Sequence, residues 1–314
     1  MGGITTGSVT ANGLDFGYLT AGPADGPLVL LLHGFPDSAH TWRHLMPELA
    51  TAGYRAVAPF MRGYAPTSVP EDGAYPTGAL AADAVALHEA LGGGPDAAVV
   101  GHDWGAFAAY GAAAFASGRW RKAVAMSVPP MSVMTGAFFE YEQLKRSFYM
   151  FVFQSPIAGA ILGRAFIEGL WRDWSPPDPD PDPDPGSGSG AGGRARHNRH
   201  AEDIDHVMEC LATPDSVTAA LGYYRALFDP SRHSDRYAAE QEAFSVMGDV
   251  PVLYLHGSED GCVGADVVAP DGDLGGVLAA LPPGSRADLV PDAGHFLQLD
   301  RPADVNSRIL GWLR

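Results

Sequence analysis

An aspartate stands at the centre of the segment best suited to chemistry, Gly101-His102-Asp103-Trp104-Gly105. An apolar run precedes the segment and a stretch of small residues follows it, so the glycines permit a tight strand-to-helix turn with Asp103 at its top. A carboxylate is ionised at neutral pH and can attack saturated carbon without a base, which leaves an alkyl ester on the protein. An ordinary turn with a solvated aspartate has the same short pattern, so the segment alone leaves both interpretations open.

Two later segments offer the groups that hydrolysis of such an ester requires. Gly257-Ser258-Glu259-Asp260 follows one apolar run, and Asp292-Ala293-Gly294-His295 follows another. Ligands of open parallel sheets bind beyond the carboxyl ends of the strands, so we expect Asp260 and His295 near Asp103. A neutral imidazole can activate water near neutral pH, and a carboxylate can orient that imidazole. The order along the chain is therefore nucleophile, acid, histidine.

Alternating strands and helices must position these groups. Residues 8–20 alternate around Asn12-Gly13, which predicts a hairpin. Short apolar runs separated by helical spacing predict further strands at 28–32, 54–59, the run before Gly101, 122–127, 251–255 and 286–290. The helices between them are expected at about 42–52 and 77–91, after the turn at Asp103, and at the end of the chain. This pattern indicates an α/β fold with a mostly parallel central sheet flanked by helices.

The regular alternation stops between about residues 130 and 248, where aromatic and helical segments take over. We expect this part to be a helical cap inserted into a core made of residues 1–129 and 249–314. Repeated Asp-Pro followed by Gly and Ser at 175–193 predicts a flexible surface loop in the cap. Three histidines near it, His197, His200 and His206, are expected to be solvated, and no metal site is expected.

The charge balance limits the classes of partner. There are 37 acidic and 20 basic residues, for a net charge of −17, which disfavours nucleic acids and anionic membranes. The two cysteines fit a reducing compartment, no signal-like segment opens the sequence, and no run is long enough to span a membrane. A cytoplasmic location is expected, and the oligomeric state is not indicated.

In combination, four motifs carry a specific resemblance: His33-Gly34-Phe35-Pro36, the segment around Asp103, Gly257–Asp260 and Gly294-His295. Together they resemble the α/β-hydrolases with an aspartate nucleophile, the branch that includes epoxide hydrolases and haloalkane dehalogenases. The resemblance covers nearly the whole chain apart from the Asp-Pro segment. It implies an α/β-hydrolase fold with an inserted helical cap, and no metal or organic cofactor.

The resemblance also implies roles for individual residues. Asp103 would be the nucleophile, His295 the base that activates water, and Asp260 the acid that orients His295, with Glu259 as the adjacent alternative. The backbone N–H groups of Phe35 and Trp104 would form the oxyanion hole. Structural rather than catalytic roles are expected for three further histidines: His33, His102 and His256.

Two tyrosines of the predicted cap could donate hydrogen bonds to the leaving group. Tyr149 precedes Phe153-Gln154-Ser155-Pro156 by four residues, and Tyr224 lies in Leu221-Gly222-Tyr223-Tyr224-Arg225. Both contexts resemble cap segments of epoxide hydrolases, where paired phenols hydrogen-bond the departing oxygen. Core packing is the alternative for any single aromatic residue of a cap helix. Haloalkane dehalogenases often carry Asn after the first His-Gly, whereas this chain has Phe35.

We therefore expect an epoxide hydrolase that uses water to convert an epoxide into a vicinal diol through an ester on Asp103. The alternatives are a haloalkane dehalogenase, another hydrolase of carbon–heteroatom bonds, or a catalytically silent ligand-binding protein of the same fold. Trp104, Phe35, Tyr149 and Tyr224 are expected to contact a small apolar substrate. Several phenylalanines of the cap could also hold an aromatic or lipid-like molecule: Phe138, Phe139, Phe148, Phe151, Phe153 and Phe166.

Overall fold

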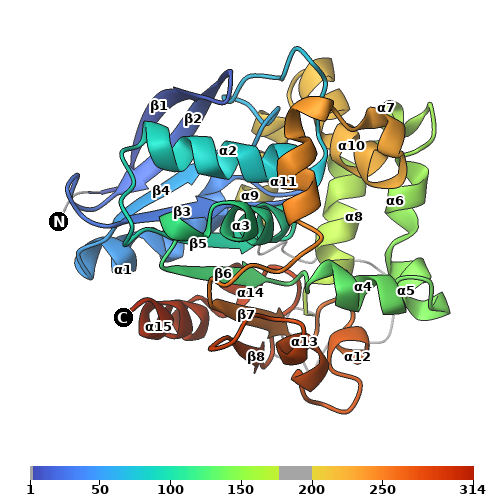
Figure 1. Ribbon diagram of the computed structural model, residues 1–314. Helices are drawn as coiled ribbons and strands as arrows, with labels where there is room; N and C mark the ends of the chain where they lie inside the picture. Colours follow the sequence, from blue (N-terminus) through green and yellow to red (C-terminus); the bar gives the residue numbers. More distant parts are fainter. Residues whose placement is uncertain (1–2, 177–199) are drawn as a thin grey trace, which may run out of the picture.

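A single eight-stranded sheet forms the centre of the protein (Figure 1). The computed structural model describes residues 3–176 and 200–314. The strands lie in the order β1-β2-β4-β3-β5-β6-β7-β8. Their bounds are β1 Thr5–Ala11, β2 Leu14–Ala21, β3 Leu28–Leu32, β4 Arg55–Pro59, β5 Ala98–His102, β6 Lys122–Met126, β7 Val252–Gly257 and β8 Arg286–Val290. β2 pairs antiparallel with β1 and β4, and all other neighbouring strands are parallel.

The strand patterns of the sequence explain this sheet. β3 and β5 are buried along their whole length, as expected for central strands covered on both faces. At the edge, Asn12 and Gly13 have φ values of 47° and 77°, and Ala11 pairs with Leu14. Positive φ at both central residues is typical of the two-residue hairpin turn that Asn-Gly favours. The predicted hairpin and the predicted α/β architecture are therefore confirmed.

The helices that alternate with the strands pack against the sheet. The helices and 3₁₀ turns that belong to the strand-helix alternation are η1 Ala39–His44, α1 Met46–Thr51, α2 Thr77–Ala90, α3 Trp104–Phe115, η2 Ser117–Arg119, α12 Ala265–Val268, α13 Gly275–Ala279, α14 Leu297–Asp300 and α15 Pro302–Leu313. α2 and α3 pack together, and α3 also contacts β3, β5 and β6. Asn306 of α15 donates to the carbonyl of His44 and to Glu48, which ties the C-terminal helix to η1 and α1.

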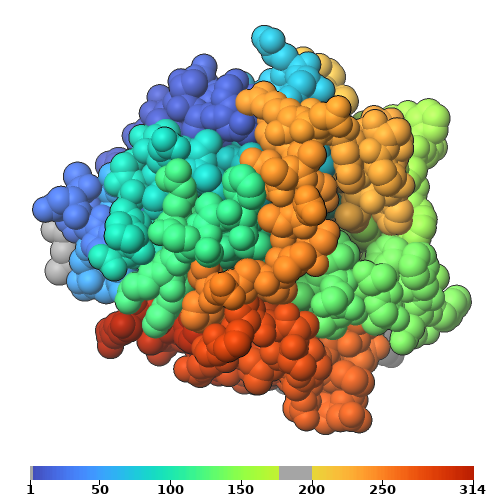
Figure 2. Space-filling view, in the orientation of Figure 1, coloured from blue at the N-terminus to red at the C-terminus, as the bar shows by residue number. Residues whose placement is uncertain are grey.

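Short helices make up the inserted region between β6 and β7. They are α4 Met131–Ala137, α5 Tyr141–Arg146, α6 Phe148–Val152, α7 Ala158–Ile161, α8 Arg164–Trp174, α9 Ala201–Cys210, α10 Pro214–Phe228, η3 Pro230–Arg232, η4 Asp235–Tyr237 and α11 Ala238–Ala243. The last of them, α11, packs on α2 and α3, and Gln241 accepts a 2.8 Å hydrogen bond from the N–H of Gly78. Figure 2 shows this orange segment on the surface between the blue-green core and the green cap. A division of the chain at residues 130 and 248 stays a prediction.

Two local expectations need correction. The helix predicted over 42–52 begins instead as a 3₁₀ turn at Ala39, because the Ser38 side chain accepts from the N–H of His40 and caps the turn earlier. His200, expected to be solvated, is buried: its ring lies 5.0 Å from that of Trp171, and its imidazole lies 3.7 Å from Asp203. His197 and most of the predicted Asp-Pro loop, residues 177–193, lie outside the described residues. In the described ranges, no helix has the length and apolarity needed to cross a bilayer.

Candidate active site

The turn between β5 and α3 places Asp103 above the sheet. Asp103 has φ 54° and ψ −119°, a conformation that costs a residue with a side chain about 1–3 kcal/mol. The turn also requires its two glycines, because a Cβ on Gly101 would overlap the backbone of Gly105, and a Cβ on Gly105 would overlap the carbonyl of Leu32. Local strain and close backbone contact therefore hold the Asp103 carboxylate at the top of the turn, where it borders a cavity.

The loop after β3 supplies a backbone donor to that carboxylate. The N–H of Phe35 donates to Oδ1 of Asp103 at 2.7 Å. Gly34 lies directly against the carboxyl group, where a Cβ would overlap it. Trp104, the other predicted donor, is the first residue of α3, and its side chain borders the same cavity as Asp103. A contact from the N–H of Trp104 to the reacting group stays a prediction.

His295 lies between two carboxylates. Its Nδ1 is 3.0 Å from Oδ2 of Asp260, and its Nε2 is 3.5 Å from Oδ2 of Asp103. Burial lowers the pKa of His295, but Cys262, Asp260 and Asp103 raise it by more, so its pKa lies well above the ordinary value. Burial raises the pKa of the Cys262 thiol, so the thiol is neutral at neutral pH. His295 has a carboxylate on each side, and a negative charge on either one stabilises the imidazolium.

Asp260, rather than Glu259, contacts the histidine. Glu259 is exposed, whereas Asp260 is buried and its Oδ1 accepts from the N–H groups of Cys262 and Val263 at 2.8 and 3.0 Å. Burial raises the pKa of Asp260, but the charge of His295 and its hydrogen bond lower the pKa by more. The net pKa of Asp260 therefore lies below the usual value. The carboxylate is held in place by backbone donors on one oxygen and the imidazole on the other.

The three other histidines near these strand ends hold backbone in place. His102 Nε2 hydrogen-bonds the carbonyl of His295 at 2.8 Å, and His33 Nε2 accepts from the N–H of Met61 at 2.9 Å. Burial lowers the pKa of His33 to about 4 and that of His102 to about 3, so both are neutral at neutral pH. His256 bonds the hydroxyl of Tyr254 and lies 3.8 Å from Asp260. None of them borders the cavity over Asp103.

Two cap tyrosines reach that cavity from different helices. Tyr149 of α6 and Tyr224 of α10 have ring centroids 5.5 Å apart, and both border the cavity together with Asp103. Burial raises the pKa of each well above its usual value, so both hydroxyls are protonated donors. The Tyr224 hydroxyl is buried and has no hydrogen-bond partner in the described chain. The neighbouring Tyr223 instead donates to the carbonyl of Arg62 at 2.8 Å and faces the core.

Cys262 is a part of the site that sequence reasoning missed. Its Sγ lies 3.6 Å from the hydroxyl of Tyr149, and its side chain borders the cavity. Its position in the sequence could have indicated this, because Cys262 lies two residues after Asp260 in the same loop at the end of β7. The thiol therefore packs beside the Tyr149 hydroxyl, and the backbone N–H of Cys262 bonds Asp260.

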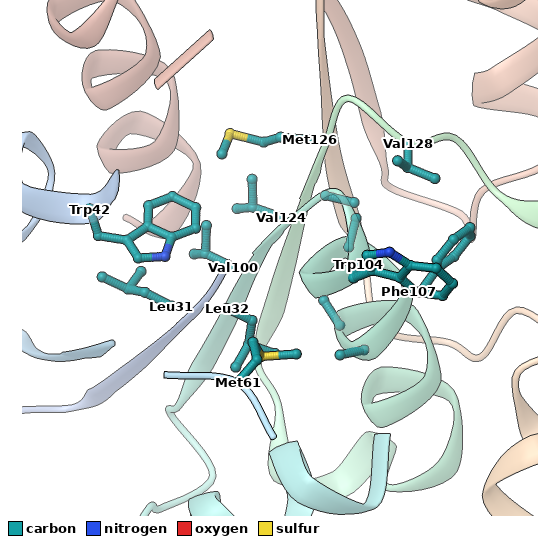
Figure 3. Close-up of a cluster of buried hydrophobic side chains, with 14 of the residues drawn as sticks. Leu31, Leu32, Trp42, Met61, Val100, Trp104, Phe107, Val124, Met126 and Val128 are labelled. Atoms are coloured by element: carbon teal, nitrogen blue, oxygen red, sulfur yellow. The ribbon is translucent and has the colours of Figure 1, made fainter. Parts of the chain in front are cut away.

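The cavity itself is small and largely apolar. It holds about 180 Å³ and extends from Asp103 between α4 and α10. Figure 3 shows Trp104 and Phe107 on the same side of α3, with Val128 above them, and all three border the cavity. Residues of the two cap helices complete the wall: Met131, Met134, Thr135, Phe138, Phe139, Leu227 and Phe228. Within residues 3–176 and 200–314, no group of three or more His, Cys, Asp or Glu side chains is arranged to hold a metal ion.

Comparisons with known proteins identify relatives of similar sequence and fold. A family model described as the alpha/beta hydrolase fold matches residues 27–153. The chain is 32% identical to epoxide hydrolase A of Mycobacterium tuberculosis over the whole chain and 98% of that relative. Among solved structures, epoxide hydrolase A from Mycobacterium thermoresistibile is 28% identical with a TM-score of 0.71, covering 99% of this chain and 98% of that chain. An epoxide hydrolase from Vigna radiata is 26% identical with a TM-score of 0.73, covering 99% and 97%.

Proposed function

This chain belongs to the epoxide hydrolase family of the α/β-hydrolase fold, and from that premise we propose that it converts an epoxide into a vicinal diol through an ester on Asp103. One observation carries the proposal. Asp103 shares an apolar cavity with two protonated phenols, and His295 lies 3.5 Å from its carboxylate. A carboxylate nucleophile, two acidic donors and a histidine base are the groups that opening and hydrolysis of an epoxide require.

In the first step, Asp103 attacks one epoxide carbon. An oxygen of the carboxylate forms the new carbon–oxygen bond, and the ring bond to that carbon breaks with its electron pair on the epoxide oxygen. Tyr149 and Tyr224 hydrogen-bond this oxygen, and one of them gives it a proton. The proton of the His295 imidazolium restores the tyrosine hydroxyl, so the step yields a hydroxyl group, an ester and a neutral imidazole.

In the second step, His295 takes a proton from water, and the resulting hydroxide attacks the ester carbonyl to give a tetrahedral intermediate. The bond from the carbonyl carbon to the diol oxygen then breaks, and the proton of the added hydroxyl passes to that oxygen, which releases the diol and restores the Asp103 carboxylate. Ester formation has removed the negative charge of Asp103, one of the charges that raise the pKa of His295, so the imidazole can act as a base. Asp260 stabilises the imidazolium as it forms again. The N–H of Phe35, now 2.7 Å from an Asp103 oxygen, stabilises the negative charge on that oxygen, with Trp104 N–H as the proposed second donor.

Trapping the ester tests this function. His295→Gln removes the base, so incubation with a reactive epoxide such as styrene oxide is expected to add the mass of one epoxide to the intact protein. The adduct should map to the peptide that contains Asp103. Asp103→Asn is the matched control, because it keeps the shape of the side chain and removes the nucleophile.

Three outcomes separate the alternatives. Diol formation by the unchanged protein together with a trapped adduct in His295→Gln supports the proposal. Halide release from an alkyl halide, with epoxides inert, identifies a dehalogenase and contradicts it. Binding of either compound without product or adduct identifies a silent binding protein and contradicts it as well.

A further inference from the structure

Among the described residues, 3–176 and 200–314, the cavity extends from Asp103 toward α4 and α10. Beyond Asp103 and the two tyrosines, most residues that border it come from α3, from the loop after β6, and from α4 and α10, and the others are Gln143, Ser147, Met150, Cys262 and Val263. Met131 and Met134 of α4 and Leu227 of α10 form its walls, and Phe139 borders its outer end with an exposed fraction of 72%. A substituent on a bound epoxide can therefore extend from Asp103 toward α4 and α10.

Aromatic side chains fill the opposite side of the two tyrosines. Phe35 and Phe153 have exposed fractions of 0%, and Trp174 has 2%. The ring of Phe153 lies 5.6 Å from that of Tyr149 and 5.1 Å from that of Tyr224, and Phe35 packs edge-on to Phe153 at 5.5 Å. None of these three side chains borders the cavity. Together they form what we call the closed wall, Phe35, Phe153 and Trp174.

Two residues of the closed wall, Phe35 and Trp174, hydrogen-bond Asp103 and His295 through their backbone groups. The N–H of Phe35 bonds Asp103, and the carbonyl of Trp174 accepts from the N–H of His295 at 2.8 Å. The ring of Trp174 also lies 5.1 Å from those of Tyr149 and His295. Moving the wall to admit a second substituent would therefore disturb the nucleophile, the base and a phenol donor at once.

The polar side chains along the open direction already have partners. Gln143 donates to the Cys262 carbonyl and to Ser147 Oγ at 2.9 and 3.0 Å, and it accepts from the N–H of Gly264. Thr135 donates to the carbonyl of Met131 at 2.8 Å. Among the cavity-lining groups of the described residues, the Tyr224 hydroxyl is buried without a hydrogen-bond partner, and in the proposed reaction the epoxide oxygen accepts from it. A polar substituent would lose its water here without gaining a hydrogen bond.

We propose that the site is selective for terminal epoxides that carry hydrocarbon on one carbon, and that it rejects epoxides substituted on both carbons. This inference rests on the proposed function. The volume sets the size of the substituent: an apolar cavity of about 150 Å³ holds a benzene molecule, so about 180 Å³ accommodates one aryl ring or an alkyl group of similar bulk. The unsubstituted CH₂ group of the ring lies toward the closed wall.

A pair of isomers tests the proposal directly in the unchanged protein. α-Methylstyrene oxide carries its extra methyl on the carbon that bears the phenyl group, whereas trans-β-methylstyrene oxide carries it on the other carbon. We expect kcat/KM for the trans-β isomer to be about 10- to 200-fold lower than for the α isomer and for styrene oxide, as for one misplaced methyl group in a packed pocket. trans-Stilbene oxide is expected to give no turnover.

A variant of the closed wall provides the second test. Phe153→Ala opens space beside both tyrosines, so it should raise the ratio of kcat/KM for the trans-β isomer over the α isomer by at least about 10-fold. Phe115→Ala, a phenylalanine at the far end of α3, is the matched control and should leave the ratio unchanged. The isomer comparison needs no substitution, so it decides the question even where Phe153→Ala does not fold.

The outcomes separate this inference from the function on which it rests. Equal kcat/KM for the two isomers overturns the selectivity while leaving epoxide hydrolysis intact. A faster reaction with the para-carboxylate of styrene oxide than with styrene oxide overturns the requirement for a hydrocarbon substituent. If no epoxide forms diol and His295→Gln traps no adduct, the proposed function itself fails.

Discussion

Nε2 of His295 lies 3.5 Å from Oδ2 of Asp103, while Nδ1 of the same ring lies 3.0 Å from Asp260. The imidazole therefore responds to the charge state of the nucleophile. Asp260 and Asp103 both raise the pKa of His295. In the proposed mechanism the ester on Asp103 would leave Asp260 as the remaining carboxylate beside the imidazole, so formation of the ester would create the base that removes it.

The pH dependence of the two steps follows from that coupling. Ester formation uses the His295 proton, and the pKa of His295 in the free protein is raised, so the alkylation rate should stay high through neutral pH and fall only in alkaline solution. Ester hydrolysis needs the neutral imidazole, so its rate should fall toward acid. Stopped-flow measurement of tryptophan fluorescence in single turnovers separates the two rates. A loss of both rates on the same side of neutrality contradicts the coupling.

The tyrosines should act on the first step alone. Tyr149→Phe and Tyr224→Phe each remove a donor to the departing oxygen, so each should slow alkylation, and the double variant should slow it by about 10²- to 10⁴-fold. Tyr223→Phe is the matched control: its hydroxyl bonds the Arg62 carbonyl in the core, so alkylation should be unchanged. An unchanged alkylation rate in the double variant would remove the phenols from the mechanism.

Asp37 should make the protein less stable as pH rises from about 4 to about 8. Burial raises the pKa of Asp37 from 3.8 to about 8, so the folded protein holds a proton there that the unfolded chain releases from about pH 4 upward. A raised folded pKa means that the free energy of unfolding falls as pH rises through that range. The buried His33 and His102 are neutral in both states above about pH 6.5, so they do not oppose this fall.

Asp37→Asn isolates this contribution. The amide cannot ionise, so the variant should lose less stability than the unchanged protein between about pH 6.5 and about pH 9 in urea denaturation. His295 titrates in both proteins and cancels in the comparison. Parallel curves for the two proteins would show that the Asp37 carboxyl is not held protonated in the fold.

A buried ion pair supports the loop next to the site. Arg62, which is fully buried, bonds Asp83 through Nε at 2.6 Å and through Nη2 at 2.7 Å. Asp83→Ala leaves the guanidinium unpaired, so the free energy of unfolding should fall by about 3–5 kcal/mol. Asp205→Ala breaks an exposed pair with Arg164 and should cost about 1 kcal/mol or less. Similar losses in the two variants, measured by chemical denaturation, would contradict this assignment.

Local sequence patterns were enough to predict most of the fold and the order of Asp103, Asp260 and His295 along the chain. The turn at Asp103 could be predicted because two glycines, a buried strand and a small-residue helix are encoded within a few positions. The strand ends that carry Asp260 and His295 could be predicted for the same reason. The sequence left open whether Glu259 or Asp260 contacts His295. In the structure Asp260 points inward to His295, whereas Glu259 is exposed.

The shape of the cavity could not be predicted in this way. The closed wall joins Phe35 after β3, Phe153 after α6 and Trp174 at the end of α8, which lie far apart along the chain. The aromatic composition of the cap suggested a uniform lining, yet Phe138 and Phe139 border the cavity whereas Phe148 and Phe151 are half exposed on the outside. Which face each short cap helix presents depends on tertiary packing rather than on its own periodicity.

Heavy-oxygen water provides the most direct measurement of the central claim. In a single turnover with excess protein, the water oxygen should enter the carboxylate of Asp103 and be found by mass spectrometry in the peptide that contains it. The first diol released should then carry no label, because one of its oxygens comes from the epoxide and the other from Asp103. Label found in the first diol and absent from Asp103 would contradict the ester mechanism.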